Sequence, residues 1–404
     1  MRCIYLIGTF DTKSDELLYL KSIIESNDLR VCLVDVGTRS SPVLVDFSNE
    51  TVASHHQDGA QVVLGTNDRG IAVENMSIAL CNFMQHRDDI SGVIGIGGSG
   101  GTALVAPMMQ RMPIGIPKLL VSTVASGNVE AYVGTSDISM MYSVVDFLGL
   151  NPILKKILRN AGNSIAGMVK GLSDEIEINS EKKSIGLTMF GVTTTCVEAL
   201  CQSFSERFNC LVFHATGTGG QSMEKLADSG LLDGVIDITT TEVCDYFFDG
   251  VFPCLPTRFD VFAQTKLPYV GSVGALDMIN FGPKSTVPLK YKSRNLYVHN
   301  AQVTLMRTNE SENDKMGCWI AEKLNKMDGE VRFLLPLAGV SAIDAPGQPF
   351  YDPTADAALF KAIEDNLIIT EKRKLIKVDC NINDVEFASA ALGEFKEAFD
   401  SVGN

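Results

Sequence analysis

The sequence predicts an α/β protein made of two doubly wound, Rossmann-like parallel-sheet lobes with a cleft between them. Short β-rich runs alternate with helical patterns, which is typical of parallel strands joined by crossover helices. The chain has 404 residues, whereas single hydrophobic cores stop growing at roughly 250–300, so two lobes are expected. A charged stretch at residues 173–183 separates two regions in which the alternation starts afresh, and we place the domain boundary there.

The first lobe is expected to span residues 1–178. Its strands are predicted where β-branched and other apolar residues form short runs, and its helices where apolar residues recur at helical spacing. In chain order these elements are strand Cys3–Ile7, helix 13–27, strand Val31–Val36, helix 69–86, strand Gly92–Ile96, helix 101–110, strand Lys118–Ser122 and helix 151–160. Residues 38–65 are polar without clear periodicity, which predicts a long connection.

The second lobe is expected to span residues 184–404 by the same criteria. Its predicted strands are Ser184–Phe190, Cys210–His214, Gly234–Ile238, Tyr269–Ser272, Val331–Leu335 and Lys374–Val378. Its predicted helices lie near 193–208, 221–229, 310–326, 355–367 and 383–399. Setting Gly8 against Gly191 aligns the first strand–helix turn of each lobe. The faint similarity around these glycines indicates either a duplication or two βαβ units that obey the same rules.

A glycine-rich turn follows the third predicted strand, with glycines at positions 97, 98, 100 and 101, and a helix comes directly after it. Such a turn exposes backbone N–H groups at the positive end of the helix dipole, which favours a phosphate or another anion. Ser99 and Thr102 add hydroxyl donors. The alternative is that the glycines only permit a tight turn and close helix packing. The segment is neither a P-loop nor a G-x-G-x-x-G fingerprint in its usual position.

Ligands of a doubly wound sheet bind beyond the carboxyl ends of its strands. The candidate nucleotide-binding residues at those ends are Gly8, Thr9, Asp11, Thr12, Gly97, Gly98, Ser99, Gly100, Gly101, Thr102, Thr123, Ser126 and Gly127. Some of these have a second interpretation. Asp11 or Thr12 would equally well cap the next helix, and Asp11 would alternatively bind a Mg²⁺ ion that accompanies the nucleotide. Asp35 either contacts a ribose or caps a helix or turn.

The second lobe has a further strand–turn–helix candidate for substrate binding, at Thr216, Gly217, Gly219 and Gly220. Thr240 follows the next predicted strand. Arg258 and Arg307 stand in weakly charged sequence and have the planar donor forks that suit a carboxylate or phosphate, although surface ion pairs explain them as well.

Two residues of this lobe are candidates for acid–base chemistry, Glu242 and His214. The alternatives are a capping box formed by Thr239 with Glu242, and a hydrogen-bonded core position for His214. The five histidines show no Ser–His–Asp or Cys–His order, so the catalytic residues stay undetermined.

Composition limits the partners. A net charge of −15 argues against a nucleic acid or an anionic membrane surface. Ten cysteines without a C-x-x-C pair predict neither a zinc cluster nor a disulfide framework, and no metal site is predicted. Without a signal peptide or a membrane span, the protein is expected in the cytoplasm. The apolar stretch Ile138–Leu150 is hard to bury inside one lobe, which predicts a homodimer.

The chain resembles the bacterial, fungal and plant family that includes the N-terminal ATP-binding domain of the tomato tobamovirus-resistance protein. Five segments in order support the resemblance: Ile7–Lys13, Gly97–Thr102, Asp237–Glu242, Gly274–Gly282 and Ala345–Asp352. The resemblance spans essentially the whole chain, and it implies a two-lobed α/β protein, commonly dimeric, that binds ATP. The turn Phe248–Phe252 departs from the more glycine-rich turn that is expected there.

Two function classes follow from these observations. The protein is either an enzyme that acts on a small metabolite in the interlobe cleft with ATP held by the first lobe, or a non-catalytic regulator whose lobes close on the nucleotide. The two polar-lined lobes favour the enzyme. The lack of legible acid–base pairs favours the regulator.

Overall fold

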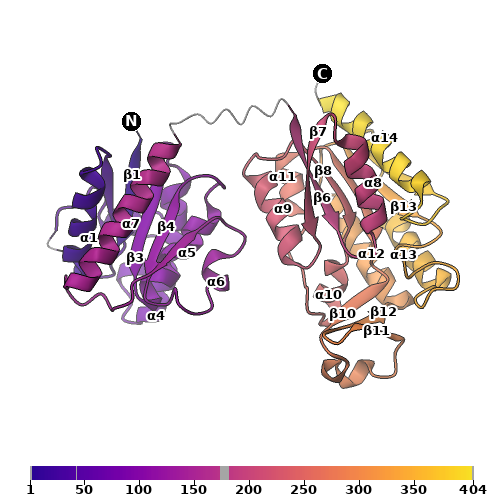
Figure 1. Cartoon of the computed structure of the whole chain (residues 1–404), viewed down its shortest axis with the longest axis horizontal. Coiled ribbons are helices and arrows are strands. Elements are labelled where there is room, and N and C mark those ends of the chain that lie inside the picture. The colour runs from indigo at the N-terminus through magenta and orange to yellow at the C-terminus, as the bar shows by residue number, and fades with distance from the viewer. Residues whose placement is uncertain (1, 42, 173–181, 403–404) are drawn as a thin grey trace. The chain divides into compact units, whose positions relative to one another are not determined.

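The computed structural model describes residues 2–41, 43–172 and 182–402. The chain divides into two compact units, Met1–Asn179 and Ser180–Asn404 (Figure 1). Both are α/β lobes built on parallel sheets, which confirms the predicted fold class. Residues 173–181 of the predicted boundary lie outside the described residues.

The first lobe contains a five-stranded parallel sheet in the order β2-β1-β3-β4-β5. The chain order reverses between β1 and β3, which is the switch point of a doubly wound sheet. The strands are β1 (Cys3–Gly8), β2 (Val31–Asp35), β3 (Ile90–Gly97), β4 (Lys118–Ser122) and β5 (Ser139–Tyr142). The first four confirm the predicted strands to within about two residues.

Helices cover both faces of this sheet because β1 is apolar on both sides. Ile4 and Leu6 pack against α1 (Phe10–Glu25) and α7 (Pro152–Gly171). Tyr5 and Ile7 point to the opposite face, where α4 (Arg69–Gln85) and α5 (Ser99–Arg111) lie. Shorter helices complete the lobe: α2 (Asn49–Ala53), α3 (Gln61–Leu64) and α6 (Glu130–Val133).

Of two predictions for the first lobe, the long connection needs correction, whereas the apolar stretch 138–150 is partly exposed, as expected. The connection at 38–65 contains α2 and α3, which are too short for a periodic pattern to reveal. The apolar stretch 138–150 begins as β5, the edge strand of the sheet, and buries Ile138 and Phe147 in the lobe. Other side chains of that stretch are exposed, with Leu148 at 90% and Val144 at 57% exposed.

The second lobe contains a six-stranded parallel sheet in the order β14-β13-β9-β8-β6-β7. Its first five strands in chain order repeat the arrangement of the first lobe, with the switch point between β6 and β8. The strands are β6 (Lys183–Met189), β7 (Phe208–His214), β8 (Gly234–Thr239), β9 (Tyr269–Gly274), β13 (Val331–Pro336) and β14 (Arg373–Val378).

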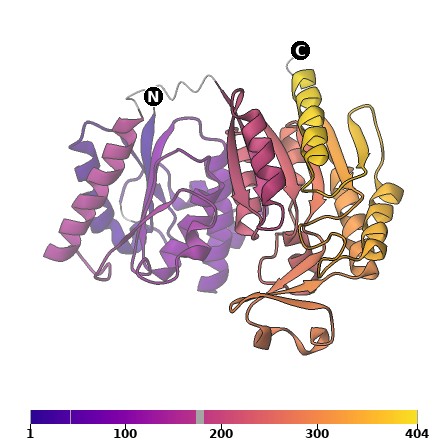
Figure 2. The same ribbon diagram turned by 45° about the vertical axis from the view of Figure 1, so that its right-hand side comes forward.

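Helices again cover both faces. α8 (Thr194–Phe204) and α14 (Val385–Val402) enclose one core, to which Leu187 and Ile238 of the sheet contribute, and Figure 2 shows both helices on that face. The other core lies under α9 (Thr218–Asp228), α11 (Asp260–Thr265), α12 (Glu310–Leu324) and α13 (Pro353–Asn366). α10 (Glu242–Phe248) follows β8.

A small antiparallel sheet, which the sequence did not reveal, extends the second lobe. It consists of β10 (Met278–Phe281), β12 (Val303–Arg307) and β11 (Leu296–Asn300), in that order, with the 3-10 turns η1 (Lys284–Thr286) and η2 (Leu289–Tyr291) between β10 and β11. It lies at the end of the lobe to which β6 runs (Figures 1 and 2). No helix among the described residues combines the length and apolar character needed to cross a bilayer.

Candidate functional site

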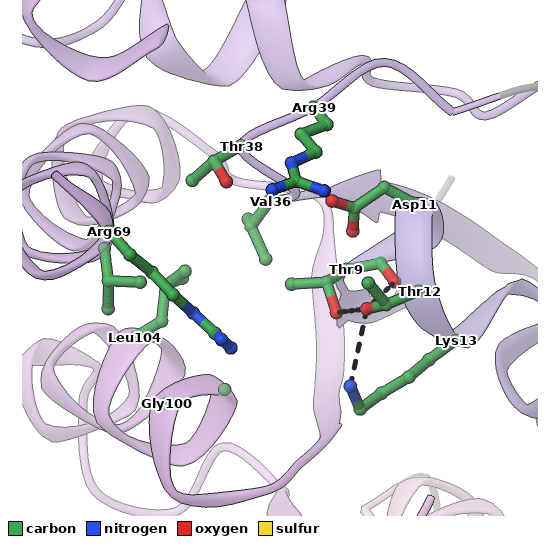
Figure 3. Close-up of a pocket in the computed structure, with 12 residues that line it drawn as sticks. Thr9, Asp11, Thr12, Lys13, Val36, Thr38, Arg39, Arg69, Gly100 and Leu104 are labelled. Carbon is green, nitrogen blue, oxygen red and sulfur yellow. Dashed lines mark hydrogen bonds between the residues drawn. The ribbon is translucent and has the colours of Figure 1, made fainter. Parts of the chain in front are cut away.

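A cavity of about 220 Å³ opens at the carboxyl ends of β1, β2 and β3, next to the switch point of the first lobe (Figure 3). Four segments line it: the turn from β1 into α1, the residues after β2, the start of α4 and the start of α5. The lining residues are Thr9, Asp11, Thr12, Lys13, Val36, Thr38, Arg39, Arg69, Val73, Gly100, Gly101 and Leu104.

The cavity is cationic although the chain as a whole is strongly acidic. Lys13, Arg39 and Arg69 line it, with Asp11 as the one carboxylate among the lining residues. Neither guanidinium makes an ion pair or a hydrogen bond within the part of the chain that the structure describes. Figure 3 shows the Arg69 side chain reaching toward Gly100 and the Arg39 side chain on the side of Asp11. Two unpaired guanidinium groups at one cavity favour an anionic ligand.

The N-terminus of α5 adds backbone donors. Gly98 occupies the N-cap position, and no side chain caps the helix. The first intrahelical bond is donated by Thr102 to the Gly98 carbonyl at 2.9 Å, so the N–H groups of residues 99–101 have no acceptor in the described part of the chain. Gly100 and Gly101 line the cavity. The helix therefore presents free donors and its positive dipole end to the same space as the cations.

The glycines of this turn have two different roles. A Cβ on Gly97 would lie 2.8 Å from the Gly101 Cα, so Gly97 permits a close approach of backbone to backbone. A Cβ on Gly100 would meet no atom within 4 Å. Close packing therefore explains Gly97, whereas nothing in the lobe requires position 100 to lack a side chain.

The turn from β1 into α1 places polar side chains at the other wall. The Thr9 and Thr12 hydroxyl groups are 2.8 Å apart, and Lys13 Nζ lies 3.4 Å from the Thr12 hydroxyl. No side chain caps α1 at Thr9, and Lys13 breaks the helical geometry with φ −135° and ψ 28°. The buried Asp11 Oδ1 has no hydrogen-bond partner, so capping does not explain this carboxylate.

Several predicted nucleotide-binding residues lie elsewhere. Thr102 is fully buried, and its hydroxyl bonds to the Gly98 carbonyl and to Ser122. Asp35 accepts hydrogen bonds from the N–H groups of Phe10 and Gly37, which supports the capping interpretation, and burial raises the pKa of its carboxyl. Gly8 lies against Leu17 of α1. The other predicted residues that do not line the cavity are Gly97, Gly98, Ser99, Thr123, Ser126 and Gly127.

The sequence did not single out Arg39 and Arg69. Their positions in the sequence could have indicated a role in binding, because Arg39 follows the end of the second strand and Arg69 begins the next long helix. Both positions border the carboxyl edge of a doubly wound sheet. Single arginines outside any motif resemble surface residues, so only the fold brings them to one cavity.

The glycine turn at the start of α9 binds a carboxylate of the chain itself, that of Glu242. The Gly217 N–H donates to Glu242 Oε2 at 2.9 Å, and a Cβ on Gly220 would overlap the same carboxylate. A Cβ on Gly219 would overlap the His214 carbonyl. These glycines thus allow the buried Glu242 to pack against the start of α9, where the helix dipole stabilises its charge. The expected capping box is absent, because the Thr239 hydroxyl bonds to Thr193 and to the Thr188 carbonyl, and Thr241, the N-cap of α10, makes no side-chain cap bond.

Arg258 corrects the expectation of weakly charged surroundings. Its fully buried guanidinium bonds to Glu242 at 2.7 Å, to Glu224 at 2.8 Å and to Asp237 at 2.7 Å. All three nitrogens are engaged, so the group is an internal counter-ion with no donor directed at solvent.

Arg307 is likewise buried. It contacts Asp356 at 2.7 Å and Asp344 at 3.4 Å, and its Nε donates to the Phe350 carbonyl at 2.7 Å. Asp277 lies in the same region, with its Oδ2 bonded to Ser341 and its Oδ1 without a partner. Thr240 is buried too, and its hydroxyl bonds to the Ser272 carbonyl at 3.2 Å.

His214 does not occupy the hydrogen-bonded core position of one interpretation, and its role in acid–base chemistry stays a prediction. It ends the edge strand β7 and is exposed, with its ring 5.2 Å from the Phe190 ring. Together with Thr216 it lines a second cavity of about 300 Å³, at the carboxyl ends of β6 and β7.

Buried carboxyl groups make the stability of the second lobe depend on pH. Burial raises the pKa of Glu242 and of Asp245 to about 7, and it raises the pKa of Asp277 and Asp356 as well. In unfolded chains such groups titrate near pH 4, roughly. A raised folded-state pKa favours the neutral carboxyl, so this contribution to stability is complete below about pH 4 and is lost as the pH rises through about 7.

We therefore expect the second lobe to unfold at a lower urea concentration at about pH 8.5 than at about pH 6, with a free-energy difference of at least ~1 kcal/mol. The fluorescence of Trp319, the single tryptophan of the chain, reports this lobe. Asp277→Asn, which removes one titrating group, should reduce the difference. An equal or higher midpoint at the alkaline pH would contradict the assignment.

Two family models match the chain, both described as belonging to the uncharacterised protein family UPF0261: the N-terminal domain over residues 2–174 and the C-terminal domain over residues 182–399. A UPF0261 protein of Rhizobium meliloti is 52% identical over 397 residues, which cover 98% of this chain and 99% of that protein. A UPF0261 protein of Clostridium tetani is 44% identical over 393 residues, which cover 96% of this chain and 96% of that protein. The ToMV resistance protein Tm-1 of Solanum lycopersicum is 45% identical over 418 residues, which cover 98% of this chain but 55% of the tomato protein.

Proposed function

The chain belongs to the uncharacterised protein family UPF0261, and from the geometry of its first lobe we propose that it is a nucleotide-binding protein that holds the phosphates of ATP at the N-terminus of α5. One observation supports this most strongly. Three cationic side chains and the free N–H groups of a helix N-terminus surround one cavity at the switch point of a parallel sheet.

Two kinds of surface would contact the nucleotide, one polar and one apolar. The phosphates contact the backbone N–H groups at residues 99–101 and the side chains of Arg69 and Lys13. The apolar Val36, Val73 and Leu104 line the same cavity and suit the less polar part of the nucleotide. Asp11, whose Oδ1 has no partner, would hold the Mg²⁺ that accompanies ATP through a single carboxylate, the remaining ligands being phosphate and water.

The two guanidinium groups give the direct test. Arg39→Gln and Arg69→Gln each remove a charge that has no partner among the described residues, so we expect no loss of stability. Each charge-assisted bond to a phosphate contributes about 1.5–3 kcal/mol, so each variant should weaken ATP binding at least about tenfold in calorimetry. Arg159→Gln, on the exposed face of α7, is the matched control and should bind ATP like the original chain.

Two modes of action are compatible with nucleotide binding: turnover with a small metabolite, or a regulatory response without chemistry. Incubation with ATP and Mg²⁺, followed by measurement of ADP and phosphate, separates them. Release of ADP that Arg69→Gln abolishes would establish an enzyme. Saturable binding without release, with and without candidate metabolites, would favour the regulator.

We also infer a homodimer, formed through the edge of the first sheet. β5 is an edge strand with unpaired backbone groups, and the exposed Val144 and Leu148 follow it closely. A second copy of the same edge would cover both features. Sedimentation at micromolar concentration should show a dimer, and Leu148→Glu should shift it toward monomer. A monomeric original chain would refute the inference.

A further inference from the structure

We propose that the cavity next to His214 in the second lobe is a separate ligand site, and that its ligand is a small aromatic or apolar carboxylate. The cavity measures about 300 Å³. It is independent of the proposed nucleotide site, since every residue that lines it belongs to the second lobe.

This cavity lies at the same edge of its sheet as the first cavity, beyond the carboxyl ends of the strands. In the first lobe, the cavity lies after the first and second strands of a sheet whose order reverses there. In the second lobe, the turn after β6 contributes Phe190, Gly191 and Val192, and the end of β7 contributes His214 and Thr216. None of its lining residues comes from β8 or from the turn that follows it, so the cavity lies beyond β6 and β7, beside the switch point between β6 and β8.

The lining excludes a phosphate as the natural ligand. No Lys or Arg is among the residues that line this cavity. The nearby start of α9 is occupied by the Glu242 carboxylate, which accepts a hydrogen bond from the Gly217 N–H. A phosphate at the start of α9 would therefore meet the Glu242 carboxylate, whereas a phosphate at the start of α5 in the first lobe meets free N–H groups. The two cavities select different chemistry.

Apolar side chains form most of the wall. Phe190 and Val192 pack beside Leu305 and Val303 of β12, in a small cluster between the two sheets of the lobe. Phe252, from the turn that departs from the family pattern, completes the wall. These surfaces suit an aromatic ring or a branched aliphatic group.

Three polar side chains of the lining, those of His214, His299 and Asn300, have donors without a partner among the described residues, whereas the Thr216 hydroxyl donates to the His214 carbonyl at 3.3 Å. The imidazoles of His214 and His299 make no hydrogen bond within the described residues. Asn300 uses its side-chain oxygen to accept from the Gln302 N–H at 2.8 Å, which leaves its amide N–H groups unused. These three side chains are exposed, so water satisfies them in the free chain. The lining contains no Asp or Glu, so a carboxylate of the ligand would supply the charged acceptor for these donors. A carboxylate on an apolar body meets both requirements.

The test uses the intact chain and benzoate as the probe. With five histidines in the chain, the imidazole NMR signals can be assigned with His214→Gln and His299→Gln variants. Benzoate should shift both signals saturably. Gly191→Val should weaken benzoate binding at least about tenfold, because a Cβ at Gly191 meets no atom within 4 Å and the new side chain enters the open space that this residue lines. Trp319 fluorescence confirms that the second lobe of the variant is folded.

Matched outcomes decide the proposal. Gly100→Val, the corresponding substitution in the first lobe, should leave benzoate binding unchanged. The benzoate test therefore does not depend on whether the first lobe binds a nucleotide. Benzamide, which has the same shape without the charge, should bind more weakly than benzoate, and inorganic phosphate should not shift the two signals. Benzoate affinity weaker than about 10 mM, equal binding of benzamide, or unchanged binding in folded Gly191→Val would overturn the proposal.

Discussion

Replacing Arg258 with methionine should destabilise the second lobe by about 3–5 kcal/mol, because the substitution leaves buried carboxylates without a counter-ion. Arg258 is fully buried and bonds to Glu224, Asp237 and Glu242. Methionine fills similar space but neutralises none of them. Urea unfolding monitored by Trp319, which packs 5.9 Å from the Phe259 ring beside this network, measures the loss.

Two comparisons make this result specific. The loss should be smaller at about pH 6 than at about pH 8, since Glu242 can then take up a proton instead of remaining charged. Arg207→Met removes a second-lobe arginine whose ion pair with Asp400 is exposed, and it should cost only about 0–1 kcal/mol. If Arg258→Met were as stable as Arg207→Met, the buried network would not stabilise the lobe.

Gly100→Val should weaken ATP binding by at least about 2 kcal/mol, roughly thirtyfold, because the side chain occupies the space where the phosphates meet the start of α5. The lobe itself should tolerate the change, since a Cβ at this position meets no atom within 4 Å. Calorimetry of the folded variant measures the affinity.

Gly191→Val is the matched control for this substitution, because it adds the same side chain at an equally open position of the other lobe. It should bind ATP with unchanged affinity. Unchanged affinity in a folded Gly100→Val variant would exclude phosphate binding at the start of α5.

The periodic parts of the fold were predictable from the sequence. β1 and β3 are buried on both faces and therefore read as continuous apolar runs, and long helices such as α7 show their period. β5 and the strands β10 to β12 were not predicted: β5 is a partly exposed edge strand, and the other three form the small antiparallel sheet. The pairing of β10 with β12, which lie on either side of residues 282–302, depends on contacts that a local pattern does not show.

The site was predictable only in part, for a similar reason. Glycine turns after strands locate the edge where ligands bind, and Gly100, Thr9 and Asp11 do line the first cavity. The same pattern at Gly217 and Gly220 accommodates Glu242 instead, and a sequence does not reveal which anion fills a glycine turn. Arg258 is similar: its three carboxylate partners lie 16 to 34 residues away in the chain, so its surroundings read as uncharged.

The central claim is that the first lobe recognises the phosphates of a nucleotide, and a calorimetric titration of the intact chain with ATP, ADP and AMP tests it most directly. Arg39, Arg69, Lys13 and the start of α5 all favour negative charge. The affinity should therefore decrease from ATP to ADP to AMP, and added salt should weaken ATP most. Equal affinities for ATP and AMP, or no saturable binding of ATP, would contradict the claim.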